Sequence, residues 1–104
     1  MTMVDDGVKI HGFHVDGVAV VVVRGELDSD AAHLLRAEFN RLRPDEHVYV
    51  DCARVDYVDS EGLAALCEAG HRNVMSGGPL HVLASSALRH SVESNGVGHL
   101  FDLD

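Results

Sequence analysis

Four stretches of the chain have the hydrophobic pattern of β-strands. The clearest is Val18 to Val23, a continuous apolar run of mostly β-branched residues, which is typical of a central strand covered on both faces. Asp16 and Gly17 precede it and form a two-residue hairpin signal, so the looser alternation of Val8 to His14 is expected to pair with it antiparallel. The remaining two predicted strands are His47 to Cys52 and Leu80 to Ala84.

Helical spacing of apolar residues appears in three stretches between and after these strands. Asp28 or Ser29 is expected to cap the first helix, and Ser85 or Ser86 the third. The end of the chain, residues 99–103, is predicted as either a short strand or a short helix. The three predicted helices are residues 30–43, ended by Pro44, a stretch from Ser60 to the Gly-Gly-Pro at 77–79, and residues 87–94.

The order of these elements predicts the fold class. After the opening hairpin, strands alternate with helices, which implies right-handed crossovers between parallel strands. The hairpin itself requires one antiparallel pair. A chain of 104 residues fits one domain. We therefore predict a single α/β domain over residues 1–104, with a mixed β-sheet of four to five strands and the helices packed mainly on one face, since three helices are too few to cover two.

Charge and hydropathy narrow the range of partners. The chain has 17 acidic residues against 8 Lys and Arg, a formal net charge of −9. Nucleic acids and anionic membranes attract cations, so neither is expected as a direct partner. The longest apolar run is too short to cross a bilayer, and the first residues lack the pattern of a signal peptide. We expect a cytoplasmic protein.

Asp59 and Ser60 lie where an apolar strand passes through a short polar turn into the second predicted helix. The start of a helix offers unpaired backbone N–H groups and the positive end of the helix dipole, which suit a phosphate. Ser60 is therefore a candidate functional residue, although serine at this place also serves as an ordinary N-cap. Glu61 and Gly62 follow in the first turn, and Gly62 is expected to leave space beside the hydroxyl.

Catalytic, metal and cofactor sites are not indicated. Ser60 lies between two carboxylates and outside a Gly-x-Ser-x-Gly motif, which argues against a hydrolase nucleophile. The eight His form no His-x-x-x-His pair on a predicted helix and join no Cys cluster, so no metal site is expected. A glycine-rich phosphate loop is also lacking, and we expect no cofactor. Cys52 and Cys67 are interpreted as small buried hydrophobic residues.

Two sequence words, each following an apolar strand, lie about 30 residues apart. They are Gly25-Glu-Leu-Asp28 and Val55-Asp-Tyr-Val-Asp-Ser-Glu-Gly-Leu63. Together they resemble the STAS domain family and, within it, the small single-domain anti-sigma factor antagonists. The late segment Ser94-Asn-Gly-Val-Gly-His-Leu-Phe101 is similar to the ending of that family, so the resemblance covers about Val8 to Phe101.

The resemblance implies a partner switch. In this family the unmodified antagonist binds an anti-sigma factor that is also a Ser/Thr kinase, and this frees a sigma factor. The kinase then phosphorylates the serine after the motif aspartate, here Ser60, the phosphorylated form dissociates, and a PP2C-type phosphatase resets it. The chain would thus be a binding module and not an enzyme, with a partner surface at Asp28, Asp59, Ser60, Glu61 and Gly62.

Glu61 departs from the family pattern, because many members have a second Ser or Thr at this position. It either stabilises the first helical turn electrostatically, by about 0.3–1 kcal/mol, or adds a negative charge that retunes the kinase encounter. Two other functions stay open. One is a non-switching STAS subunit of a transport or stress complex, in which Ser60 only caps. The other is a small-ligand-binding or enzymatic α/β domain.

Overall fold

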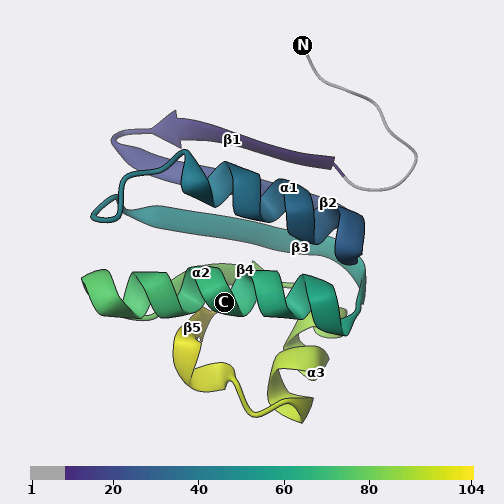
Figure 1. Cartoon of the computed structure of the whole chain (residues 1–104). Coiled ribbons are helices and arrows are strands. Elements are labelled where there is room, and N and C mark those ends of the chain that lie inside the picture. Colours follow the sequence, from purple (N-terminus) through teal and green to yellow (C-terminus); the bar gives the residue numbers. More distant parts are fainter. Residues whose placement is uncertain (1–8) are drawn as a thin grey trace.

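The computed structural model describes residues 9–104, so Val8 of the first predicted strand lies outside the described residues. Within residues 9–104, five strands and three α-helices follow one another, with a 3-10 turn before the last strand (Figure 1). Their bounds are β1 Lys9–Val15, β2 Val18–Leu27, α1 Ser29–Asn40, β3 Val48–Val58, α2 Ser60–Ser76, β4 Leu80–Ala84, α3 Ser86–Ser94, the 3-10 turn η1 Gly98–Leu100, and β5 Phe101–Leu103.

The strands form one sheet in the order β1-β2-β3-β4-β5. β1 and β2 pair antiparallel through the hairpin, and every other neighbouring pair is parallel. The predicted mixed sheet and the α/β class are therefore confirmed. The two alternatives for residues 99–103 both occur, because a 3-10 turn at 98–100 leads directly into the short strand β5.

Helices cover one face of the sheet, with α1 and α2 side by side in front of it (Figure 1). On that face β2 places Val21 and Val23 in the core, whereas Val20 and Val22 on the opposite face are only partly buried. The expectation that this strand is covered on both faces is thus wrong, because no helix among the described residues packs over the second face. Buried side chains of the core include Leu27, Leu35, Val50, Leu63, Leu66, Leu80, Val82, Leu88 and Val92.

Both central strands are longer than the hydrophobic pattern predicted. β2 continues to Leu27 and β3 to Val58, and the two stay paired up to their last residues. Two register shifts, at Val22/Arg24 and Gly25/Glu26, interrupt the ladder. A bulge breaks the two-residue alternation of side chains, which explains why the strand signal in the sequence ended at Cys52.

Both cysteines are reduced, and they differ in burial. Cys52 on β3 is buried in the core, and that burial raises the pKa of its thiol to about 12. Cys67 on α2 is only partly buried, although burial also raises the pKa of its thiol. The expectation of a buried small hydrophobic residue is confirmed for Cys52, whereas Cys67 lies at the margin of the core.

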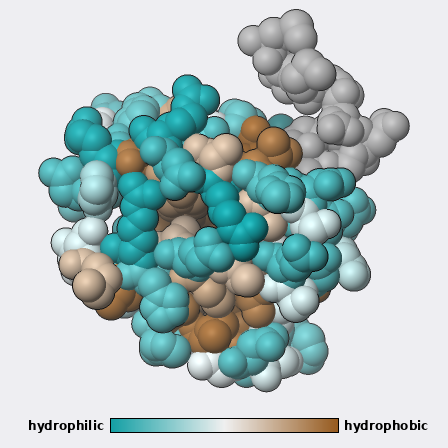
Figure 2. Space-filling view, viewed as in Figure 1, coloured by the Kyte–Doolittle hydropathy of each residue, from teal (hydrophilic) through white to brown (hydrophobic). Residues whose placement is uncertain are grey.

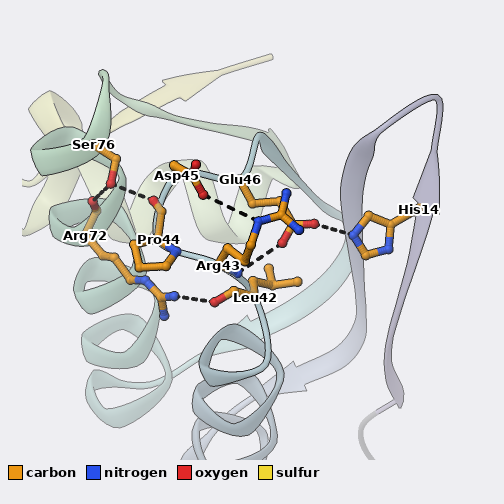
Figure 3. A network of polar contacts seen from close by, with 8 residues as sticks. All are labelled: His14, Leu42, Arg43, Pro44, Asp45, Glu46, Arg72 and Ser76. Atoms are coloured by element: carbon orange, nitrogen blue, oxygen red, sulfur yellow. Dashed lines mark hydrogen bonds and ion pairs between the residues drawn. The ribbon is translucent and has the colours of Figure 1, made fainter.

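α1 ends at Asn40, three residues earlier than predicted, and α2 satisfies the carbonyl groups left at that end. The Arg72 guanidinium donates to the carbonyl oxygens of Phe39 at 2.8 Å and Leu42 at 2.7 Å. The Ser76 hydroxyl donates to the carbonyl oxygen of Pro44 at 2.7 Å (Figure 3). The last carbonyls of a helix lack intrahelical partners, so these three bonds attach the end of α1 and its loop to α2.

Glu46 connects the same loop to the β1–β2 hairpin. Its carboxylate accepts a hydrogen bond from the backbone N–H of Arg43 at 3.1 Å and pairs with the imidazole of His14 (Figure 3). The His14 contact, followed by the Arg43 bond, lowers the pKa of Glu46 below its ordinary value. The loop after α1 and the hairpin are therefore linked at this end of the sheet through one carboxylate.

The start of α2 packs against the end of β2. The backbone N–H of Asp59 donates to the carbonyl oxygen of Leu27 at 3.1 Å. Gly62, one turn into the helix, is buried, and a Cβ atom built on it would overlap that same carbonyl and lie 2.8 Å from Cγ of Leu27. Gly62 therefore allows the helix to approach the strand. This corrects the expectation that it leaves room beside the hydroxyl of Ser60.

Substitution of Gly62 by Ala is expected to destabilise the fold. Alanine alone would favour a helix by about 1 kcal/mol, but the overlap with Leu27 forces the backbone apart, and overpacking of this kind typically costs about 1–3 kcal/mol. Urea denaturation measures the net loss. Gly77→Ala is the matched control, because no atom lies within 4 Å of a Cβ placed there. A Gly62→Ala protein as stable as the wild type would contradict the proposed packing role.

Arg72→Met is expected to lower the free energy of unfolding by about 1–3 kcal/mol, because two carbonyls of the α1 end lose a charged donor. The stability of Arg72→Lys should lie between those of the wild type and Arg72→Met, since one ammonium cannot reproduce the planar fork that reaches both oxygens. Arg41→Met is the control, because Arg41 is exposed at the same helix end. Urea midpoints with unchanged slopes give the comparison. Equal losses for Arg72→Met and Arg41→Met would show that the carbonyl contacts contribute nothing.

Glu46→Gln removes the charge and keeps an acceptor oxygen for the Arg43 amide. Because the folded-state pKa of Glu46 is lowered, its ionisation stabilises the fold above the unfolded value of about 4.3. That contribution is lost as the pH falls through the lower folded-state pKa. The difference in stability between wild type and Glu46→Gln should thus be present at neutral pH and vanish in acid. Urea denaturation over a pH series tests this, and a difference that grows on acidification would refute it.

Candidate functional site

Two helices begin next to each other at one end of the sheet. α1 follows β2 and α2 follows β3, and the last residues of these neighbouring parallel strands, Leu27 and Val58, are paired. Asp28 and Asp59 each lie one residue beyond the end of their strand. They are therefore found at the same end of the sheet (at the right in Figure 1). The two sequence words that lie 30 residues apart along the chain are thus brought together.

Both aspartates cap the helices that they precede. The Asp28 carboxylate accepts a hydrogen bond from the backbone N–H of Ala31 at 3.1 Å, and that of Asp59 accepts from Gly62 at 2.9 Å. Each aspartate has extended backbone angles, as an N-cap residue requires. The expected capping role of Asp28 is confirmed, and Ser29 is the first residue of α1 instead.

Ser60 is the first residue of α2 and is exposed. The interpretation of Ser60 as the N-cap is wrong, because Asp59 holds that position and supplies the capping carboxylate. The serine hydroxyl consequently has no capping duty. It lies at the end of the helix where backbone N–H groups and the helix dipole favour an anion.

Acidic residues surround this end of the sheet. Glu26, Asp56 and Glu61 are exposed, and Asp28 and Asp59 are partly buried by their capping bonds. Glu61 lies in the first turn of α2, where a negative charge is electrostatically favourable. The surface around Ser60 is therefore anionic, and its complement would be a basic surface.

An ion pair between α1 and α2 was not foreseen from the sequence. Arg36 donates from Nε and Nη2 to the two carboxylate oxygens of Glu68, both at 2.9 Å. This hydrogen bonding lowers the pKa of Glu68 and raises that of Arg36, to which the charge of Glu61 adds. The residues are 32 positions apart, so no local pattern could reveal the contact.

The same two residues border a shallow hollow of about 170 Å³ between α1 and α2. Figure 2 shows a hollow on this face ringed by hydrophilic side chains. Its floor contains Leu35, Phe39 and Ala65 from the two helices. Arg36 and Glu68 thus form a polar rim over apolar side chains.

Tyr57 is a second surface residue that the sequence reasoning missed. It lies on β3 opposite Glu26, three residues before Ser60, and 52% of its side chain is exposed. Because β3 was expected to end at Cys52, Tyr57 was assigned to the polar turn. Exposed tyrosine is enriched in protein interfaces, where a large ring offers contact area at a low entropic cost.

Within residues 9–104, no three His, Cys, Asp or Glu side chains are grouped so that they could hold a metal ion. A wider hollow of about 500 Å³ lies at the opposite end of the sheet from Ser60, lined by residues such as His47, Tyr49 and His81. In the part of the chain that the structure describes, no helix is long and apolar enough to span a membrane.

Comparison with known proteins gives the family. A sequence profile described as "Mlab, STAS domain" matches residues 13–102. Among solved structures, an anti-sigma factor antagonist from Mycobacterium paratuberculosis is 25% identical with a TM-score of 0.75, over 96% of this chain and 87% of that one. SpoIIAA, an anti-sigma factor antagonist in its unphosphorylated form, is 19% identical with a TM-score of 0.70, over 91% of this chain and 87% of that one.

A third similar structure is an uncharacterized protein with a SpoIIAA-like fold from Shewanella loihica, 11% identical with a TM-score of 0.55, over 100% of this chain and 89% of that one. No curated protein sequence matches the chain. The two neighbours below 25% identity establish the fold alone. The profile match spans most of the chain and includes Asp28, Asp59 and Ser60. The chain belongs to the STAS domain family.

Proposed function

We propose that this protein is an anti-sigma factor antagonist that a Ser/Thr-kinase anti-sigma factor switches off by phosphorylating Ser60. The observation that carries the proposal is the division of roles at the start of α2. Asp59 caps the helix, and Ser60 beside it is exposed. The hydroxyl is accessible to a kinase, and its modification leaves the capping bond intact. The similarity to an anti-sigma factor antagonist at 25% identity supports this.

The unmodified protein binds the kinase through the surface around Ser60. Asp28, Asp59 and Glu61 make this surface acidic, and Tyr57 adds an exposed ring. A basic surface on the kinase complements it. Binding engages the anti-sigma factor and so releases the sigma factor. The protein is thereby a binding module and a kinase substrate, acts in the cytoplasm, and needs neither a cofactor nor direct contact with nucleic acid or membrane.

Phosphorylation changes binding without disturbing the fold. A phosphate on Ser60 adds a charge of about −1.5 to −2. At a helix N-terminus this charge is tolerated within the protein itself, because the dipole and the N–H groups favour it. Inside an interface the phosphate opposes association even beside a basic partner surface, because it loses its hydration and is larger than the hydroxyl that the interface accommodates. The phosphorylated protein therefore dissociates, and a PP2C-type phosphatase restores the binding form.

Glu61 affects both the stability of α2 and the electrostatic surroundings of Ser60. Its position in the first turn stabilises α2, as any acidic residue does there. Its negative charge also interacts with the guanidinium of Arg36 on α1, whose pKa it raises, and it lies one residue from the hydroxyl of Ser60. Gly62 is buried against Leu27 and acts through packing. The contact surface therefore consists of Asp28, Tyr57, Asp59, Ser60 and Glu61.

The test incubates the full chain with ATP and the kinase-like anti-sigma factors of the source organism, followed by intact mass measurement and peptide mapping. One phosphate on Ser60 is expected, and none on Ser60→Ala. Ser29→Ala is the matched control, because Ser29 is likewise the first residue of a helix capped by an aspartate, but is partly buried. A stable complex without any phosphate would refute the switch and favour a non-switching STAS subunit.

Binding and stability measurements complete the test. Ser60→Ala should keep the wild-type free energy of unfolding within about 0.5 kcal/mol, because Asp59 provides the cap, and should bind the kinase without being released by ATP. Ser60→Glu should stay folded and bind at least tenfold more weakly. Calorimetric titration gives both affinities. Equal binding by the two variants would show that charge at position 60 does not control the partner.

A further inference from the structure

β1 forms one edge of the sheet. It pairs with β2 on one side, and no strand among residues 9–104 pairs with its other side (Figure 1). All seven residues are paired with β2 in an unbroken register, without a bulge. At the opposite edge β5 has only three residues. β1 is therefore a long regular edge with unpaired backbone groups.

The hairpin turn determines which backbone groups point outward. Asp16 and Gly17 have φ angles of 52° and 81°, both positive, as in a type I′ turn. Such a turn closes on a hydrogen bond between the carbonyl of Val15 and the N–H of Val18. Because the direction alternates along an antiparallel ladder, Val15, Phe13 and His11 bond to β2. The N–H and C=O groups of Ile10, Gly12 and His14 face away from the sheet.

Proteins usually protect such an edge. The known devices are short strands, prolines, bulges, and charged side chains, especially lysines. β1 has seven residues, no proline, no bulge and no acidic residue, and its one lysine, Lys9, is its first residue, although the chain as a whole has a net charge of −9. Two copies of an acidic protein repel each other least where acidic residues are missing from the strand. The long regular edge and the lack of acidic residues along it both suit pairing with a second copy of this chain.

Side chains along β1 are suited to the same approach. Phe13 and Val15 are 43% and 49% exposed on the sheet face that no helix covers, and the ring of His11 stacks on Phe13 at 5.8 Å. On the helix-covered face, the Glu38 carboxylate occupies the space beside Gly12 in which a side chain would otherwise lie. An antiparallel neighbour would meet apolar rings on one face and a carboxylate on the other.

We propose that β1 pairs antiparallel with β1 of a second copy about a twofold axis at Phe13, so that two sheets become one. In this register, Gly12 exchanges both backbone hydrogen bonds with His14 of the second copy, and the two Phe13 rings face each other at a non-hydrogen-bonded position, where side chains are closest. His14 of the second copy, whose imidazole also contacts Glu46 of its own chain, then lies next to Glu38.

A register centred on Gly12 pairs Ile10, Gly12 and His14, one more outward residue than the register centred on Phe13, but it brings the two Glu38 carboxylates together. The electrostatics therefore select Phe13 as the centre. About five residues of each strand pair, over a length of roughly 17 Å. The surface buried by this contact is smaller than that of a standard interface, which is about 800 Å² per partner. The dimer is accordingly weak, in the micromolar range or above. It forms away from Ser60 and does not depend on the phosphorylation switch.

Sedimentation velocity of the full chain, from low micromolar to near-millimolar concentration, tests the proposal. The wild type should shift towards a dimer. Phe13→Lys and Phe13→Glu should each weaken self-association about tenfold or more, because like charges then face each other on the axis. An equimolar mixture of the two variants should restore the dimer, because the charges are opposite. Tyr57→Lys changes a similarly exposed aromatic residue on β3, which β2 separates from β1. It is the matched control and should resemble the wild type.

Hydrogen exchange measured by NMR on the wild type tests the pairing without any substitution. The amide protons of Gly12 and His14 should exchange more slowly as the concentration rises, whereas those of His11 and Phe13, already bonded to β2, should not change. A monomer at all concentrations would overturn the proposal. So would self-association that leaves the Gly12 and His14 amides unprotected, or protection that appears only when a different protein is added.

Discussion

The parallel pairing of β2 with β3 is the constraint on which the rest of the molecule depends. It continues through two register shifts to the last residue of each strand, and so brings the starts of α1 and α2 to adjacent positions. The carbonyl of Leu27 then receives the N–H of Asp59, and a glycine at position 62 allows the first turn of α2 to lie against that carbonyl. Both aspartate caps, and with them the orientation of Ser60, follow from this contact.

A helix start that already has its cap is free to carry a modifiable side chain. When the capping residue is itself modified, a phosphate removes the bond that stabilises the first turn. Here the capping carboxylate belongs to Asp59 and the candidate hydroxyl to Ser60. The capping bond that stabilises the fold and the hydroxyl that would be modified therefore belong to neighbouring residues, so selection can change one without weakening the other.

The sequence predicted those parts of the fold in which a regular pattern and a local signal coincide. The Asp16-Gly17 turn, the strand at Leu80 and the caps of α1 and α3 are examples. It failed where geometry departs from a simple period, as in β3 beyond Cys52, where a register shift hides the strand. Asp59 and Ser60 are both good cap residues, and only the extended backbone of Asp59 decided between them. Contacts such as that of Arg72 with Phe39 join residues more than 30 positions apart and leave no local trace.

α2 is long enough to separate the end of the molecule that contains Ser60 from the end that holds the loop after α1. Ser60 begins the helix, and Ser76 at its far end attaches the loop that follows α1. Seventeen residues at 1.5 Å each extend about 25 Å, roughly three Debye lengths at physiological ionic strength. Charges introduced at one end are thus screened before they reach the other. The polar network around Arg72 and Glu46 can diverge between relatives, or carry a fluorescent label, while the potential at the Ser60 hydroxyl stays unchanged.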